Sequence, residues 1–219
     1  MDLDFVQLIP SIPFILEGLI TTFKIITLAG LLGLVGGIIL AVCKISNIAL
    51  LKWLANFYTS LFRGTPLVLQ LILIFYGAPQ LFGTDIEAYT AAVLAFSLNS
   101  SAYISEILRA GIQAVDKGQT EASAALGLSN SQTMIHVVLP QAFKNILPAL
   151  MNEFITLTKE SAVVTVIGVQ DVMRRSYIVG SDLYRFFEPV LFAGLVYYIV
   201  VMILTFIGKL IERRLSRSD

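Results

Sequence analysis

The sequence is poor in charge, cysteine and histidine. Charged residues make up 14% of the 219 residues, whereas an average soluble domain has roughly 25%. Basic and acidic residues balance at 15 each, so the chain lacks the positive charge expected of a nucleic-acid-binding protein. The single cysteine, Cys43, excludes an internal disulfide, and the single histidine, His136, has no second ligand at metal-binding spacing. We therefore expect neither a metal site nor a nucleic-acid partner.

Nucleotide-binding and catalytic motifs are also missing. No GxxxxGK[ST] loop occurs, because Gly208-Lys209 lacks both the upstream glycine and the following hydroxyl residue. The sequence contains no nucleophile elbow and no dinucleotide-binding fingerprint. We therefore expect the chain to have no enzymatic activity and to hold no cofactor of its own.

Long apolar segments are what the sequence does contain. Hydrophobic residues make up 57% of the chain, and a membrane-spanning helix needs about 20 mostly apolar residues. The pattern predicts an all-α membrane protein with a single transmembrane domain over residues 1–219 and a second span bent by Gly64 and Pro66. The five predicted spans are Ile20–Val42, Trp53–Gly77, Ala88–Leu108, Met134–Thr158 and Pro189–Ile211.

Two of these spans carry polar residues. On the third, Asn99, Tyr103 and Glu106 share one helix face, and Glu106 is spaced to pair with Arg109. Polar groups at membrane depth face the bundle or a water-filled path, so we expect the fourth helix to line such a path. Its polar stripe comprises Gln141, Asn145, Asn152, Thr156 and Lys159, with Glu153 and Glu160 on an adjoining stripe.

The basic residues predict the orientation of the chain. Residues 1–20 and the connection Gly77–Glu87 contain no lysine or arginine. The positive-inside rule then places the N-terminus outside and the C-terminus in the cytosol. Arg174, Arg175 and Arg185 run against this assignment, in a charged connection that follows the short apolar stretch Ala162–Val169. That stretch is too short to span, and we expect a re-entrant or interfacial segment there.

The connection between the third and fourth spans has strong local signals. Glu121–Leu126 is a short run of helix formers, and Gly127 can turn the chain after it. Ser129 and Gln132 fit a capping box that opens the next helix, which Pro140 is expected to interrupt. A short helix held between two long ones suits a structure gripped by a partner protein.

These residues resemble the EAA loop of ABC-importer permease subunits. Glu121, Ala122, Gly127, Leu139 and Pro140 match it, while Ser123 replaces the second alanine and Val137 the usual isoleucine. Two further stretches, RGTPLVLQL (Arg63–Leu71) and NSSAYISEILRAGI (Asn99–Ile112), resemble the polar amino acid branch of these permeases. Together the resemblance covers nearly the whole chain.

The resemblance implies a type I ABC importer permease fold in the lipid of the bacterial plasma membrane. It implies a second permease subunit, identical or related, two ATPase subunits that bind ATP and Mg, and a separate extracellular amino acid-binding protein. The cytosolic coupling helix would lie near residues 118–128. The residues that it assigns to ATPase coupling are Glu121, Ala122, Ser123, Gly127 and Pro140.

We predict that the substrate is a cationic amino acid such as arginine, lysine or histidine. Glu160, near the end of the fourth span, would receive the side-chain cation, unless it forms a structural pair with Lys159 or a nearby arginine. Asn99, Ser100 and Thr156 complete the predicted substrate-binding residues. The alternatives are a glutamine/glutamate- or cystine-type ABC permease, an ion-coupled secondary carrier, for which the sequence shows no internal repeat, and a membrane scaffold.

Overall fold

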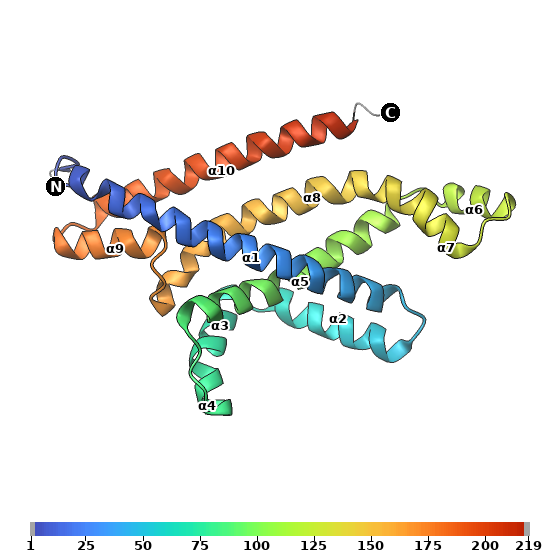
Figure 1. Ribbon diagram of the computed structural model, residues 1–219, viewed down its shortest axis with the longest axis horizontal. Coiled ribbons are helices and arrows are strands. Elements are labelled where there is room, and N and C mark those ends of the chain that lie inside the picture. The colour runs from blue at the N-terminus through green and yellow to red at the C-terminus, as the bar shows by residue number, and fades with distance from the viewer. Residues whose placement is uncertain (1–2, 217–219) are drawn as a thin grey trace.

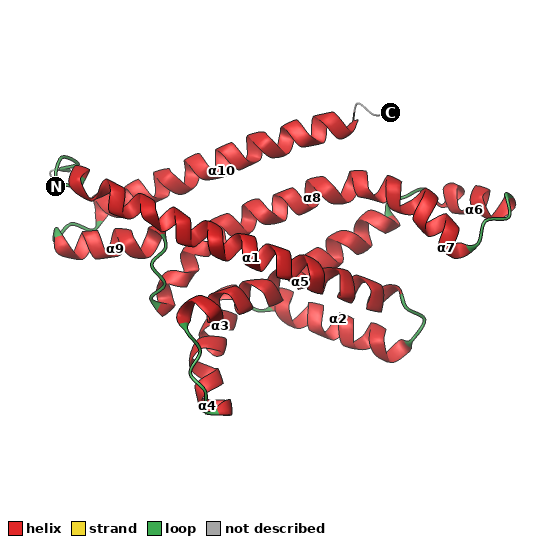
Figure 2. Ribbon diagram, viewed as in Figure 1, coloured by secondary structure: helices red, strands yellow, loops and turns green. Residues whose placement is uncertain are grey.

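The computed structural model describes residues 3–216, which form helices and connecting loops without a strand (Figure 2). Four helical segments are long and apolar enough to cross a membrane, and a bent helix pair can make a fifth crossing. This confirms the predicted all-α fold with about five transmembrane helices. The segments are Ile9–Ile45, Ala88–Gln113, Asn130–Ile167 and Phe187–Arg214, and the bent pair is Ala49–Gly64 with Leu67–Phe82.

The helices follow one another with short connections. In chain order they are η1 (Ile9–Ser11), α1 (Ile12–Ile45), α2 (Ala49–Gly64), α3 (Leu67–Ile72), the π-helical η2 (Leu73–Gly77), α4 (Ala78–Phe82), α5 (Ala88–Gln113), α6 (Lys117–Ala125), α7 (Asn130–Thr133), the π-helical η3 (Met134–Val138), α8 (Leu139–Glu160), the 3-10 helix η4 (Ser161–Ile167), α9 (Val172–Asp182) and α10 (Phe187–Ser216).

The bundle has two distinct ends (Figure 1). At one end, which we call the α9 end, lie α9 and the start of α1. At the other, the α6 end, lie α6, α7 and the turn between α1 and α2. The last turns of α10 point toward the α6 end, so the described part of the chain begins and finishes at opposite ends of the bundle.

Small residues let α1 and α5 pack closely. A Cβ on Gly33 would lie 2.9 Å from Cβ of Ser100, and one on Gly37 would lie 2.6 Å from Cγ2 of Ile104. Such close approach is the usual basis of helix association in lipid, where burying apolar surface contributes little. The contacts also show that α1 and α5 run parallel. They place Ser100 and Ile104 beside the middle of the α1 segment between Lys24 and Lys44, which contains no charged residue.

The break between α2 and α3 turns the chain by 103°. Pro66 cannot donate a backbone hydrogen bond, and the carbonyl groups freed at the end of α2 are bound by side chains instead. Gln70 Nε2 donates to the Phe62 carbonyl at 2.9 Å and to the Thr65 carbonyl at 3.1 Å. Asn99 Nδ2 donates to the Phe62 carbonyl at 3.2 Å and to Gln70 Oε1 at 3.0 Å. The predicted bend is therefore present and is held by two buried amides.

Several predicted boundaries were wrong. The first spanning helix begins well before Ile20, because the charge of Glu17 is paired with Arg175 at 2.8 Å and does not end the helix. Helical structure continues past Gly77 to Phe82, which shortens the predicted connection to five residues, 83–87. The stretch Ala162–Val169 continues α8 directly as η4 and ends at Gly168, whose φ is +83°; its re-entrant or interfacial position stays a prediction.

Candidate functional site

One side of the single chain exposes polar groups at membrane depth. On α8, Asn145, Asn152 and Lys159 recur every seven residues and are exposed. The side chain of Arg63 is 45% exposed, and it lines one cavity together with Tyr103 and Asn145. We call Arg63, Tyr103, Asn145 and Asn152 the polar face. Lipid contact would be costly for these groups, so the polar face is suited to water or to another protein subunit.

A cavity of about 220 Å³ lies between α1, α5 and α8. Ser100 and Glu153 line it together with Gly30 and Phe154, and Ser100 Oγ donates to Glu153 Oε1 at 3.2 Å. Glu153 is largely buried and has no cationic partner among residues 3–216. A carboxylate without a counter-charge in an apolar cavity can bind a cation. The sequence placed Glu153 on a polar stripe but did not select it as a site residue.

The four predicted substrate-binding residues separate into two groups. Ser100 lines the Glu153 cavity, and Thr156 and Glu160 follow Glu153 on α8 with the spacing of one helix face. Asn99 is buried, and its amide nitrogen binds Gln70 and the Phe62 carbonyl at the α2–α3 break. Glu160 is exposed near the α9 end. Their role in binding substrate stays a prediction.

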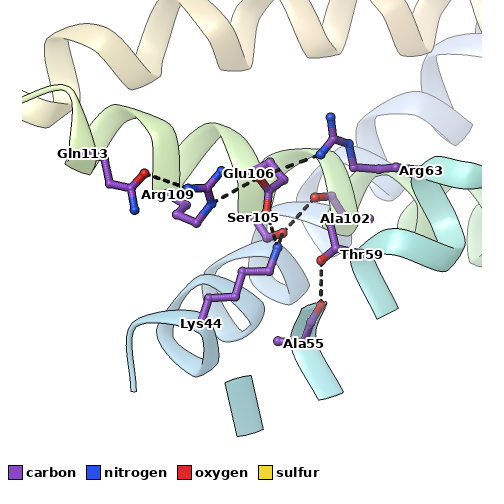
Figure 3. Close-up of polar contacts among 9 residues, drawn as sticks. All are labelled: Lys44, Ala55, Thr59, Arg63, Ala102, Ser105, Glu106, Arg109 and Gln113. Atoms are coloured by element: carbon purple, nitrogen blue, oxygen red, sulfur yellow. Dashed lines mark hydrogen bonds and ion pairs between the residues drawn. The ribbon is translucent and has the colours of Figure 1, made fainter. Parts of the chain in front are cut away.

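Glu106, in contrast, is surrounded by cations (Figure 3). Lys44 Nζ lies 2.6 Å from Glu106 Oε1, and Arg109 Nη2 lies 2.7 Å from Oε2. Arg63 approaches from α2 at 3.8 Å, and Lys44 Nζ also donates to Ser105 Oγ at 2.8 Å. The predicted pair of Glu106 with Arg109 is confirmed. We call Lys44, Arg63, Glu106 and Arg109 the Glu106 cluster, which joins α1, α2 and α5.

The connection at the α6 end forms a short capped helix. Asp116 caps α6 by accepting from the Gly118 backbone N–H at 2.6 Å, so the helix begins at Lys117, before the predicted start at Glu121. Gly127 ends it with a φ of +80°, as predicted. The predicted capping box of Ser129 with Gln132 is present.

The predicted coupling residues differ in exposure. Glu121 and Ala122 are exposed on α6, whereas Ser123 is buried and its Oγ donates to the Gln119 carbonyl at 2.6 Å. Pro140 interrupts the regular α-helix, as predicted. The helical segment Asn130–Ile167 is continuous, but its turns over Met134–Val138, directly before Pro140, are π-helical.

At the α9 end, a fully buried carboxylate joins α9 to α10. Asp171 accepts from the Arg174 backbone N–H and from the Tyr197 hydroxyl, both at 2.8 Å. Burial raises the pKa of the Asp171 carboxyl from its ordinary 3.8 to about 6. A Cβ on Gly18 would lie 2.5 Å from the Val172 backbone nitrogen, so α1 touches α9 there. These contacts give the charged connection a structural role.

Spanning helices, a cavity lined by the Glu153 carboxylate and a capped helix at one end form an arrangement suited to a membrane permease. Residues 33–217 match the family described as "Binding-protein-dependent transport system inner membrane component". The chain belongs to this family. Its membership confirms the resemblance to ABC-importer permeases and the inner-membrane location.

Curated relatives and solved structures agree with this assignment. The chain is 58% identical over 219 residues, covering 100% of both chains, to the arginine transport system permease protein ArtQ of Bacillus subtilis. It is 46% identical over 210 residues, 96% of each chain, to the putative glutamine transport system permease protein GlnP of Rickettsia felis.

Among solved structures, one described as an amino acid ABC transporter with histidines matches with a TM-score of 0.95 and 46% identity, over 98% of this chain and 100% of that one. The MetNI methionine ABC transporter matches with a TM-score of 0.77 at 22% identity, over 94% of this chain and 98% of that one, which shows the fold alone.

Proposed function

We propose that this chain is the transmembrane subunit of an ATP-driven importer of cationic amino acids such as arginine, lysine or histidine. The observation that carries the proposal is Glu153, a largely buried carboxylate that lines a cavity and has no cationic partner among the described residues. The side-chain cation of the substrate would supply the missing charge. The arginine permease relative and the transporter solved with histidines support this substrate class.

Along α8 the substrate would meet successive polar side chains, those of Glu160, Thr156 and Glu153. Their spacing of three and four residues places them on one helix face. Glu160, exposed near the α9 end, would meet an incoming cation first, and Glu153 with Ser100 would hold it deeper in the bundle. Asn99 would act through the α2–α3 break that its amide holds.

The α6 end would face the cytosol. Lys44, Lys52, Arg109 and Lys117 gather toward this end, as the positive-inside rule requires. There α6, with Glu121 and Ala122 exposed, would dock on an ATPase pair that binds ATP and Mg. A second permease subunit, identical or related, would cover the polar face around a two-fold axis, and an extracellular binding protein would deliver substrate at the α9 end.

A second candidate is a glutamine-type permease, which the 46% identical GlnP relatives favour. An amide side chain could donate a hydrogen bond to Glu153 without neutralising it. The cost of burying an unpaired charge makes the cationic substrate the better match to this cavity.

Transport in reconstituted vesicles distinguishes these functions. The permease, its ATPase and its binding protein should take up radiolabelled arginine only with ATP at the ATPase side. Excess lysine and histidine should compete, while glutamine and cystine should compete weakly. Stronger competition by glutamine would favour the second candidate. Uptake driven by an ion gradient without ATP would contradict both.

A glycine substitution tests the proposed coupling by α6. Gly127 has a φ of +80° and open space around its Cα, so Gly127→Val should distort the loop through backbone strain alone. We expect normal membrane insertion with loss of substrate-stimulated ATP hydrolysis. Gly83, with a φ of +68° and equally open surroundings, provides the matched control, because Gly83→Val lies away from α6. Full ATPase stimulation in Gly127→Val would contradict coupling through this loop.

A further inference from the structure

The guanidinium of Arg63 lies beside the spanning helix α5, toward the end of α1 that carries Lys44. Its Cζ is 5.3 Å from the centre of the Tyr103 ring. The neighbouring Ile104 packs against Gly37, within the α1 segment between Lys24 and Lys44 that contains no charged residue. A lipid-facing arginine in a spanning segment would be costly. The Arg63 side chain is 45% exposed, so it is suited to a surface that faces water or another protein subunit.

Glu106 leaves Arg63 only partly neutralised. Its two carboxylate oxygens are already bound by Lys44 at 2.6 Å and by Arg109 at 2.7 Å. Arg63 Nη1 remains 3.8 Å from Oε2, which is too long for a hydrogen bond. Three cations thus share one carboxylate (Figure 3), and the Glu106 cluster carries an excess of two positive charges.

This positive charge faces a cavity on the polar face. The cavity measures about 500 Å³ and is lined by Arg63, Tyr103 and Glu106 together with Asn145 and Ala149 of α8. Ala149 and Asn145 lie one and two helical turns from Glu153 in the direction of the α6 end. A cation that leaves Glu153 toward the α6 end therefore comes close to the Glu106 cluster.

We propose that the Glu106 cluster, through Arg63, forms an electrostatic barrier to the cationic substrate between Glu153 and the cytosol. It raises the free energy of a cationic substrate on the cytosolic side of Glu153, because like charges repel each other. An arginine in a pore is an established way to oppose cations. The barrier favours release of the substrate and opposes its re-entry from the cytosol. This inference rests on the proposed function.

Product inhibition in vesicles measures this barrier. ATP-driven uptake of labelled arginine is recorded while unlabelled arginine is preloaded on the ATPase side. In Arg63→Gln, we expect half-inhibition at about a tenfold lower internal arginine concentration than in wild type, which corresponds to about 1.4 kcal/mol. Arg63→Lys keeps the charge and should behave as wild type. Preloaded citrulline, the neutral analogue of arginine, should inhibit Arg63→Gln and wild type equally.

A second measurement needs no variant. Raising the internal KCl concentration screens the cluster, so wild-type uptake should become more sensitive to internal arginine and should not change toward internal citrulline. This keeps the proposal testable if Arg63→Gln assembles poorly.

Three results would overturn the proposal. Unchanged inhibition by internal arginine in Arg63→Gln would show that the charge of Arg63 does not act on the substrate. A shift of half-inhibition in Arg63→Lys as large as in Arg63→Gln would show that the shape of the Arg63 side chain matters instead of its charge. Dissociation of the permease pair in Arg63→Gln, with no salt effect in wild type, would assign Arg63 to the contact between subunits. Failure of the wild type to take up arginine with ATP is distinct from these, because it would refute the proposed function itself.

Discussion

Glu106 on α5 and Glu153 on α8 are two carboxylates on spanning helices with opposite surroundings. Glu106 has three cationic neighbours drawn from three helices, whereas Glu153 has a single serine and a cavity. The charge of Glu106 is neutralised by cations of the same chain, and these ion pairs connect helices. The charge of Glu153 has no such partner among the described residues and is available to a cationic ligand. The difference indicates which intramembrane carboxylate is structural and which is available to a ligand.

Removing the charge of Glu106 should have the largest effect. Glu106→Gln leaves Lys44 and Arg109 without a counter-ion in a partly buried place, and breaking such a pair costs about 3–5 kcal/mol. We expect a large drop in the thermal unfolding temperature of the detergent-solubilised protein. Glu87→Gln, at an exposed position, is the control. If the Glu106→Gln protein were as stable as wild type, Glu106 would not have the structural role that distinguishes it here from Glu153.

Removing the charge of Glu153 should leave the fold intact and reduce transport. A hydrogen bond to a charged group contributes about 1.5–3 kcal/mol, so arginine uptake by Glu153→Gln should fall by about ten- to a hundredfold. Uptake assays with internal ATP, alongside the unfolding temperature, separate the two effects. A Glu153→Gln variant that unfolds early and still transports arginine at the wild-type rate would reverse the assigned roles.

Asp171 extends the comparison to a buried carboxylate outside the predicted spans. Its pKa is raised from 3.8 to about 6 in the folded protein, so the folded state holds a proton that the unfolded state has released. The contribution of Asp171 to the free energy of unfolding is therefore fully present below pH 3.8 and is lost as the pH rises through 6. Between pH 5 and 7 the wild type should lose about 1 kcal/mol.

Asp171→Asn keeps a capping oxygen and cannot titrate. Its unfolding temperature should therefore change less over the same pH interval than that of the wild type. Measuring both proteins in detergent at pH 5 and pH 7 checks this. Parallel pH profiles would mean that another group causes the dependence.

Glu160 should show the smallest effect. It is exposed near the α9 end, where solvent weakens charge interactions to below about 1 kcal/mol. Glu160→Gln should reduce uptake of cationic amino acids by about two- to threefold and leave assembly of the complex unchanged. Wild-type uptake of arginine, lysine and histidine by this variant would make Glu160 structural.

The helices and the α6 loop could be predicted because their signals are local. Apolar runs of sufficient length, the Ser129–Gln132 capping box and the turn at Gly127 each depend on neighbours in sequence. The pair of Lys44 with Glu106 could not be predicted, because its partners are 62 residues apart. Only the parallel packing of α1 on α5 brings them together.

The candidate site was predicted less well for the same reason. Asn99 carries a polar side chain at membrane depth whether it binds substrate or holds the α2–α3 break, and the sequence does not distinguish the two. Glu153 and Glu160 lie two turns apart on α8 with the same chemistry. What separates them is the cavity formed by α1 and α5 around Glu153, which is a property of the packing.

The glycine contacts of α1 have a consequence for movement. Gly33 and Gly37 admit Ser100 and Ile104 so closely that a slip of one helical turn, about 5.4 Å, would drive larger side chains into α5. Sliding α1 along α5 would also break the ion pair of Lys44 with Glu106. Alternation between outward- and inward-open states then requires hinges elsewhere. Gly168, whose φ of +83° separates η4 from α9, is such a place, so the closest helix contact of the bundle determines where it can bend.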